Sequence, residues 1–127
     1  MASTKKRPRR DAAERGSAPP IGELMAELFR ALSHPARLRI LETLALGEQS
    51  VGELQPRIGI ELSHLSQQLR VLRRAALVGS HRNGQLVIYS IKDPLCSELL
   101  LAAKRLLIRS LSETRDLLAD LHSEVSR

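Results

Sequence analysis

The sequence predicts a mainly α-helical domain with one small β-hairpin, and three observations support this fold class. Apolar residues recur at intervals of three and four over most of the chain after residue 20, which is the period of amphipathic helices. The period changes to alternation between Leu77 and Ile91, around an Asn83-Gly84 pair that is typical of a two-residue hairpin turn. Helical spacing then returns and continues almost to the last residue. The predicted order is therefore four helices, two strands and one long helix.

The composition of the 127 residues suits a single domain that binds a polyanion. Aromatic residues are almost absent, which argues against modules that stack single-stranded bases on aromatic rings. The net charge of +6 favours a polyanionic partner. Residues 1–19 hold six Lys or Arg against two acids, whereas residues 20–127 hold fourteen against twelve. A basic surface on the folded part must therefore come from the placement of its charges.

The N-terminal residues 1–20 are basic and interrupted by prolines, which predicts a disordered arm. This arm either contacts nucleic-acid phosphates or only keeps the protein in solution. Residues 21–127 are expected to form one domain. We find no apolar run of transmembrane length and no signal peptide, so a cytoplasmic protein without membrane contact is expected. With a single cysteine, Cys96, the chain has no disulfide framework of its own.

Three helices are predicted before residue 60. The first covers residues 21–32, and the second runs from about Pro35 to Leu46, with Gly47 just past its end. Ser50 and Glu53 form a capping box that begins a short third helix. The core stripe of the second helix is expected to consist of Leu38, Ile40, Leu41, Leu44 and Ala45.

The fourth helix, residues 63–75, sorts into two faces when it is wound at 100° per residue. Its apolar face carries Leu65, Leu69, Leu72 and Ala76. Its polar face carries Ser63, Gln67, Arg70 and Arg74. Hydroxyl and amide groups can read base edges, and guanidinium groups can hold phosphates. Taken alone, the pattern fits an ordinary surface helix equally well, but the capped short helix before it completes a helix-turn-helix pattern.

The hairpin is expected to form a wing beside this helix. A turn centred on Asn83-Gly84 pairs Arg82 with Gln85 and Val78 with Tyr89. The polar tip, residues 81–85, projects outward. The face expected to pack inward consists of Val78, Val87, Tyr89 and Ile91.

The last helix is predicted from about Pro94 to Ser123, with Asp93 as its N-cap. Its apolar residues recur close to every 3.5 positions, the period of helices that pair with another helix. A homodimer would cover this seam, and the alternative is that the helix folds back on its own domain. The seam comprises Leu100, Ala103, Leu107, Leu111, Thr114, Leu118, Leu121 and Val125.

Three segments resemble the ArsR/SmtB family of bacterial transcriptional regulators: ALSHPARLRILETL (31–44), LSHLSQQLRVLRRAALV (62–78) and RNGQLVIYSI (82–91). The resemblance implies a winged helix-turn-helix that acts as a homodimeric repressor on an inverted-repeat operator in double-stranded DNA. It also implies that the first and last helices form the dimer interface. The residues that we expect in that interface are Leu24, Leu28, Leu100, Leu107, Leu111 and Leu118.

The resemblance also assigns DNA-binding residues. Base contacts fall on Ser63, His64, Ser66 and Gln67, phosphate contacts on Arg70 and Arg74, and wing-tip contacts on Arg82 and Asn83. Leu62 stands where many relatives have a polar residue, so it either touches a thymine methyl group or joins the core. Gln68 and Arg37 are interpreted as structural, with Arg37 tying helices together.

The sensing function is not carried by the family's usual metal ligands. The third helix has no Cys-x-Cys motif, and Leu95 replaces the histidine that the last helix would need, so no metal and no cofactor are expected. Cys96 is either a redox switch in the first turn of the last helix or a small apolar packing residue. No effector follows from these residues.

Two other function classes compete with DNA binding. A winged-helix module that only pairs with proteins is the alternative, because the folded part is nearly neutral. An enzyme is not expected, since the chain has no nucleophile–base arrangement, no glycine-rich phosphate loop and no carboxylate cluster with metal spacing.

Overall fold

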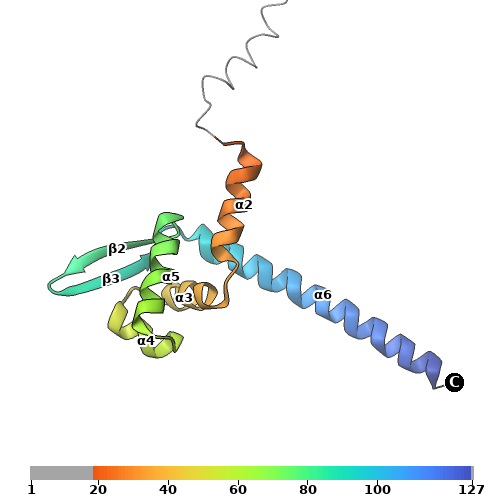
Figure 1. Cartoon of the computed structure of the whole chain (residues 1–127). Helices are drawn as coiled ribbons and strands as arrows, with labels where there is room; N and C mark the ends of the chain where they lie inside the picture. The colour runs from red at the N-terminus through yellow and green to blue at the C-terminus, as the bar shows by residue number, and fades with distance from the viewer. Residues whose placement is uncertain (1–18, 127) are drawn as a thin grey trace, which may run out of the picture.

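The computed structural model describes residues 19–126, and most of the predicted N-terminal arm lies outside this range. The described chain forms a winged helix-turn-helix with a long final helix (Figure 1). None of its helices combines the length and hydropathy required to cross a membrane. The elements in order are α2 (Ile21–Leu32), α3 (Pro35–Ala45), β1 (Gln49–Ser50), α4 (Val51–Ile58), α5 (Leu62–Arg74), β2 (Val78–Asn83), β3 (Leu86–Ile91) and α6 (Leu95–Val125).

Local capping interactions fix the starts of α3 and α4. Pro35 is at the start of α3, and the His34 side chain accepts a hydrogen bond from the amide of Ala36 at 3.0 Å. Both bonds of the predicted capping box are present, because Ser50 Oγ accepts from the Glu53 amide and Glu53 Oε1 accepts from the Ser50 amide.

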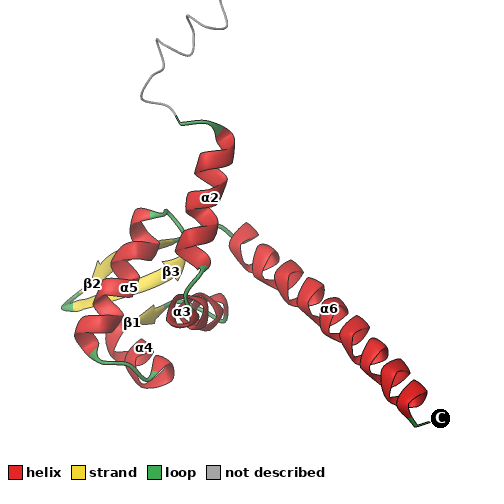
Figure 2. Ribbon diagram, turned by 45° about the vertical axis from the view of Figure 1, so that its right-hand side comes forward, coloured by secondary structure: helices red, strands yellow, loops and turns green. Residues whose placement is uncertain are grey.

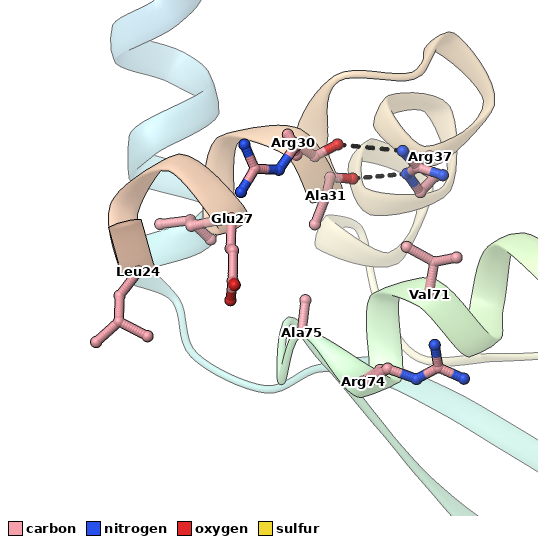
Figure 3. A pocket seen from close by; sticks show the side chains of 9 residues that line it. Leu24, Glu27, Arg30, Ala31, Arg37, Val71, Arg74 and Ala75 are labelled. Atoms are coloured by element: carbon pink, nitrogen blue, oxygen red, sulfur yellow. Dashed lines mark hydrogen bonds between the residues drawn. The ribbon is translucent and has the colours of Figure 1, made fainter. Parts of the chain in front are cut away.

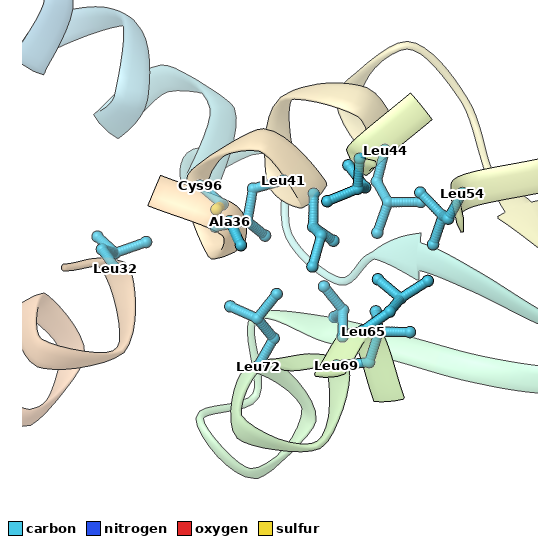
Figure 4. Packing of buried hydrophobic residues seen from close by; sticks show 12 residues of the cluster. Leu32, Ala36, Leu41, Leu44, Leu54, Leu65, Leu69, Leu72 and Cys96 are labelled. Carbon is cyan, nitrogen blue, oxygen red and sulfur yellow. The ribbon is translucent and has the colours of Figure 1, made fainter. Parts of the chain in front are cut away.

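The core lies where α3, α4 and α5 pack together and against the sheet (Figure 4). Leu38 and Ala45 are exposed rather than part of this core, so the predicted stripe of α3 was too wide. The helical turn points these two side chains away from the buried face, which Ala36, Ile40, Leu41 and Leu44 form. The fully buried side chains with the largest volumes are Ile40, Leu41, Leu54, Leu65, Leu69 and Leu72.

The wing forms as predicted, but its register is shifted by two residues. Asn83 pairs with Leu86, Arg82 with Val87, and Val78 with Ile91. The turn is therefore centred on Gly84 and Gln85. Gly84 has φ +67°, as in a type II′ turn, which places glycine at its first central position. A shift of two residues leaves every side chain on its predicted side of the sheet, so Val78, Tyr89 and Ile91 pack toward the core. Val87, predicted on the same face, is partly buried but does not join this core.

A third strand was not predicted from the sequence. The two residues of β1 pair with β3, Gln49 opposite Tyr89 and Ser50 opposite Ile88, which gives a sheet of order β1-β3-β2 (Figure 2). This strand leads directly into α4. It therefore attaches the helix-turn-helix to the base of the wing.

Helix α6 contacts the domain only through its N-terminal part, Leu95–Lys104, and then leaves it (Figure 1). Cys96 is buried, Leu99 and Leu100 are partly buried against the core, and the Lys104 ammonium pairs with Glu42 of α3. Every described residue beyond Leu100 is exposed, apart from a partly buried Ser112. The alternative that α6 folds back on its own domain is therefore wrong.

Candidate nucleic-acid interface

Helix α5 separates a buried face from a polar face, as the sequence predicts, but Ala76, predicted on the buried face, is exposed in the turn that follows the helix. Leu65, Leu69 and Leu72 are at most 1% exposed and anchor the helix on α3 and α4. Leu62 is 52% exposed, so it does not join the core. The residues that point to solvent include all six proposed contacts on this helix: Ser63, His64, Ser66, Gln67, Arg70 and Arg74.

One arginine fixes the position of α5 relative to the preceding helices. The Arg37 guanidinium donates through Nη1 to Gln68 Oε1 at 2.8 Å. It also donates to the carbonyl oxygens of Ala31 at 2.7 Å and Arg30 at 3.1 Å (Figure 3). Gln68 is only 5% exposed. Arg37 and Gln68 are therefore structural, as expected, and they join α2, α3 and α5.

A histidine pair lies at the N-terminal end of the candidate interface. The rings of His34 and His64 meet edge to face, with their centroids 6.2 Å apart. Since Nδ1 of His34 accepts the Ala36 amide proton, the cap of α3 lies beside the start of the exposed face of α5. The separation of 30 residues between the two histidines gave no sequence signal for this contact.

A positively charged cleft continues the interface from α5 to the wing. It encloses about 510 Å³ and is lined by Ser66, Arg70, Arg73, Arg74 and Tyr89. Three guanidinium groups without an acidic neighbour in the lining suit a phosphate backbone. Tyr89 was missed as a member of this site, although the alternating pattern placed it on the inward face of the hairpin.

The wing tip extends this polar surface. Arg82 and Asn83, at the end of β2, are both exposed. His81 Nε2 lies 3.8 Å from Glu48 Oε1, which links the wing to the residue before β1. The polar face of α5, the positively charged cleft and the tip of the wing therefore form one exposed polar surface.

Cys96 has the environment of a packing residue. Its side chain is 6% exposed, and burial, followed by the negative charge of Asp93, raises the pKa of the thiol. The thiol is therefore protonated at neutral pH, which disfavours the redox alternative. No group of three or more metal-ligating side chains occurs within residues 19–126.

Long apolar surfaces are left uncovered on two helices. On α6, Leu107, Leu111 and Leu118 are 58%, 61% and 51% exposed. On α2, Met25 and Phe29 are about half exposed. The two predicted dimer residues of this helix, Leu24 and Leu28, line a cleft between α2, α3 and the end of α5.

Comparison with known proteins identifies the family. Residues 32–80 match a helix-turn-helix domain family. The chain is 50% identical over 105 residues to the uncharacterized HTH-type transcriptional regulator Rv0081 of Mycobacterium tuberculosis. This match covers 82% of this chain and 92% of that protein. It is 44% identical over 69 residues to the transcriptional repressor SmtB homolog of Synechocystis, 54% of this chain and 52% of that one. The chain belongs to the ArsR/SmtB family of transcriptional regulators.

Solved structures of this family share the fold. The crystal structure of M. tuberculosis Rv0081 superposes with a TM-score of 0.71 at 50% identity, over 76% of this chain and 97% of that one. The homodimeric winged helix-turn-helix domain Mb0332 of Mycobacterium bovis superposes with a TM-score of 0.66 at 27% identity, over 72% and 84% of the two chains. Members of the ArsR/SmtB family are transcriptional regulators and not enzymes.

Proposed function

We propose that this protein is a homodimeric repressor that reads an inverted-repeat operator in double-stranded DNA. The observation that carries the proposal is the exposed row Ser63, Ser66, Gln67, Arg70 and Arg74 on α5, opposite a face that is almost completely buried. A helix held this rigidly can enter the major groove without rearranging its own domain. The Synechocystis relative is itself named a transcriptional repressor.

The two halves of α5 have different roles in this proposal. Ser63, Ser66 and Gln67 lie in its first half, where hydroxyl and amide groups contact base edges. Arg70 and Arg74 follow in its second half and hold phosphates, which fix the register of the protein on the duplex. Arg82 and Asn83 at the wing contact the minor groove or the neighbouring backbone, and His64 supplements the base contacts.

Dimerisation places two such helices on one face of the duplex. The exposed apolar seam of α6, with Leu107, Leu111 and Leu118, provides the main interface. The outer side of α2, with Met25 and Phe29, extends it. The M. bovis neighbour is a homodimer, which supports this assembly. Two-fold symmetry then requires half-sites about one helical turn, roughly 34 Å, apart.

Footprinting of the DNA upstream of the protein's own gene tests the proposal. We expect two protected half-sites one helical turn apart and a complex that contains two protein chains. The same experiment without residues 1–19 should retain the footprint, because the base contacts lie on α5. Binding only in the presence of these residues, or uniform protection of unrelated DNA, would contradict the proposal and favour a protein-pairing module.

A further inference from the structure

A second cleft opens between α2, α3 and the C-terminal end of α5 (Figure 3). It encloses about 620 Å³, which lies within the range of roughly 300–1,000 Å³ that is common for small-molecule sites. Its apolar lining comes from Leu24, Leu28 and Ala31 of α2 and from Val71 and Ala75 at the end of α5. The cleft therefore bridges a helix of the proposed dimer interface and the helix proposed to read DNA.

The charges in this cleft favour an anion. Its lining contains three arginines, Arg30, Arg37 and Arg74, and one acid, Glu27. Arg37 is occupied by its bonds to Gln68 and to two carbonyl oxygens. The side chains of Arg30 and Arg74 make no hydrogen bond or ion pair with another described residue. Two guanidinium groups are thus available against one carboxylate, which suits a ligand with a single negative charge.

The cleft can stay open in the proposed dimer. By helical geometry, Met25 and Phe29 project from α2 about 160° around the axis from Glu27, in the cleft, and about 60–140° from Leu24 and Leu28 at its edge. A partner helix that covers Met25 and Phe29 therefore packs on a different side of α2. Leu24 and Leu28, at the edge of the cleft, are better explained as its apolar wall than as the centre of a dimer interface.

We propose that this cleft binds a small amphipathic organic monoanion, whose occupation weakens DNA binding. Arg74 lines both this cleft and the positively charged cleft beside Ser66 and Tyr89. An anion paired with Arg74 would withdraw this guanidinium from a DNA phosphate, and Arg30 would add positive charge on the α2 side of the cleft. The apolar body of the ligand would rest on Leu24 and Val71. The coupling to DNA rests on the proposed function, whereas anion binding does not.

Fluorescence titration with 8-anilinonaphthalene-1-sulfonate, an aromatic monoanion, tests the site. Arg30→Ala should weaken its binding about two- to five-fold, the effect of losing one partly exposed charge pair. Glu27→Gln should strengthen it by a similar factor, because the opposing negative charge is removed. The uncharged analogue N-phenyl-1-naphthylamine should respond to neither variant. Arg109→Ala, an exposed arginine of α6, is the matched control and should leave both titrations unchanged.

Two outcomes would overturn the proposal. If the anionic probe does not bind, or binds with equal affinity to Arg30→Ala, Glu27→Gln and the unchanged protein, the cleft is not an anion site. The coupling is tested separately with a duplex that carries a red fluorophore. Saturating probe should lower duplex affinity, and less so in Arg74→Ala. Unchanged duplex affinity would refute regulation by this site, whereas failure of the protein to bind any duplex would refute the proposed function and leave the probe titration valid.

Discussion

The junction around Arg37 gives the sharpest prediction about stability. Arg37→Met keeps most of the side-chain volume but removes the bonds to Gln68 Oε1 and to the carbonyls of Ala31 and Arg30. The two bonds to carbonyls contribute about 1 kcal/mol each, and the stranded amide of Gln68 costs about 1–3 kcal/mol because it remains buried. Since these terms overlap, we expect the free energy of unfolding to fall by about 2–4 kcal/mol.

Urea unfolding followed by circular dichroism measures this change, and two further variants control it. Arg39→Met, on the same helix, loses only a bond of 3.5 Å to the carbonyl of Ile58 and should change stability by less than about 0.5 kcal/mol. Adding Gln68→Leu to Arg37→Met should recover part of the loss, since no unpaired amide then remains. If Arg37→Met costs no more than Arg39→Met, Arg37 does not hold the three helices together.

Four other predictions concern three side chains. Ala76 has φ +61° in the turn that ends α5, so Ala76→Gly should raise the free energy of unfolding by about 0.5–1 kcal/mol in urea titrations, and a loss would show that the strain is absent. Ser50→Ala removes the capping bond to Glu53 and should lower the thermal midpoint by an amount equivalent to about 1 kcal/mol, whereas an unchanged midpoint would argue against the cap. Because burial and Asp93 raise the pKa of Cys96, the folded state retains the thiol proton, and the contribution of this thiol to the free energy of unfolding should be lost as pH rises through the range of thiol ionisation. Iodoacetamide should accordingly modify Cys96 far more slowly in the folded than in the urea-unfolded protein, and equal rates would contradict its burial.

Helical elements could be predicted closely because their signals are local. The bounds of α2 follow from the spacing of its apolar residues, and the capping box at Ser50 and Glu53 fixes the start of α4. The two faces of α5 follow from the same periodicity. The width of the buried stripe in α3 was predicted wrongly, because the burial of each side chain depends on which other elements pack against the helix.

The sheet was harder to predict because pairing depends on distant residues. By their residue types, Asn83 and Gly84 fit the two central positions of a hairpin turn. In the structure the central positions are held by Gly84 and Gln85, so the same glycine takes the first position of the turn instead of the second. Strand β1 has only two residues and is defined by its partners in β3. The sequence also gave no signal that Arg73 and Tyr89 share a cleft, since they come together only when α5 packs on the hairpin.

The affinity of Gln67→Ala for an operator duplex and for a scrambled duplex tests the central claim most directly. The claim is that the polar face of α5 reads base sequence. Losing one amide contact to a base should reduce operator affinity by about 1–3 kcal/mol and leave affinity for the scrambled duplex unchanged. Arg74→Ala should weaken both duplexes, and Arg115→Ala on α6 should affect neither. If Gln67→Ala binds the operator as tightly as the unchanged protein does, Gln67 does not read bases and the assignment of the α5 face is wrong.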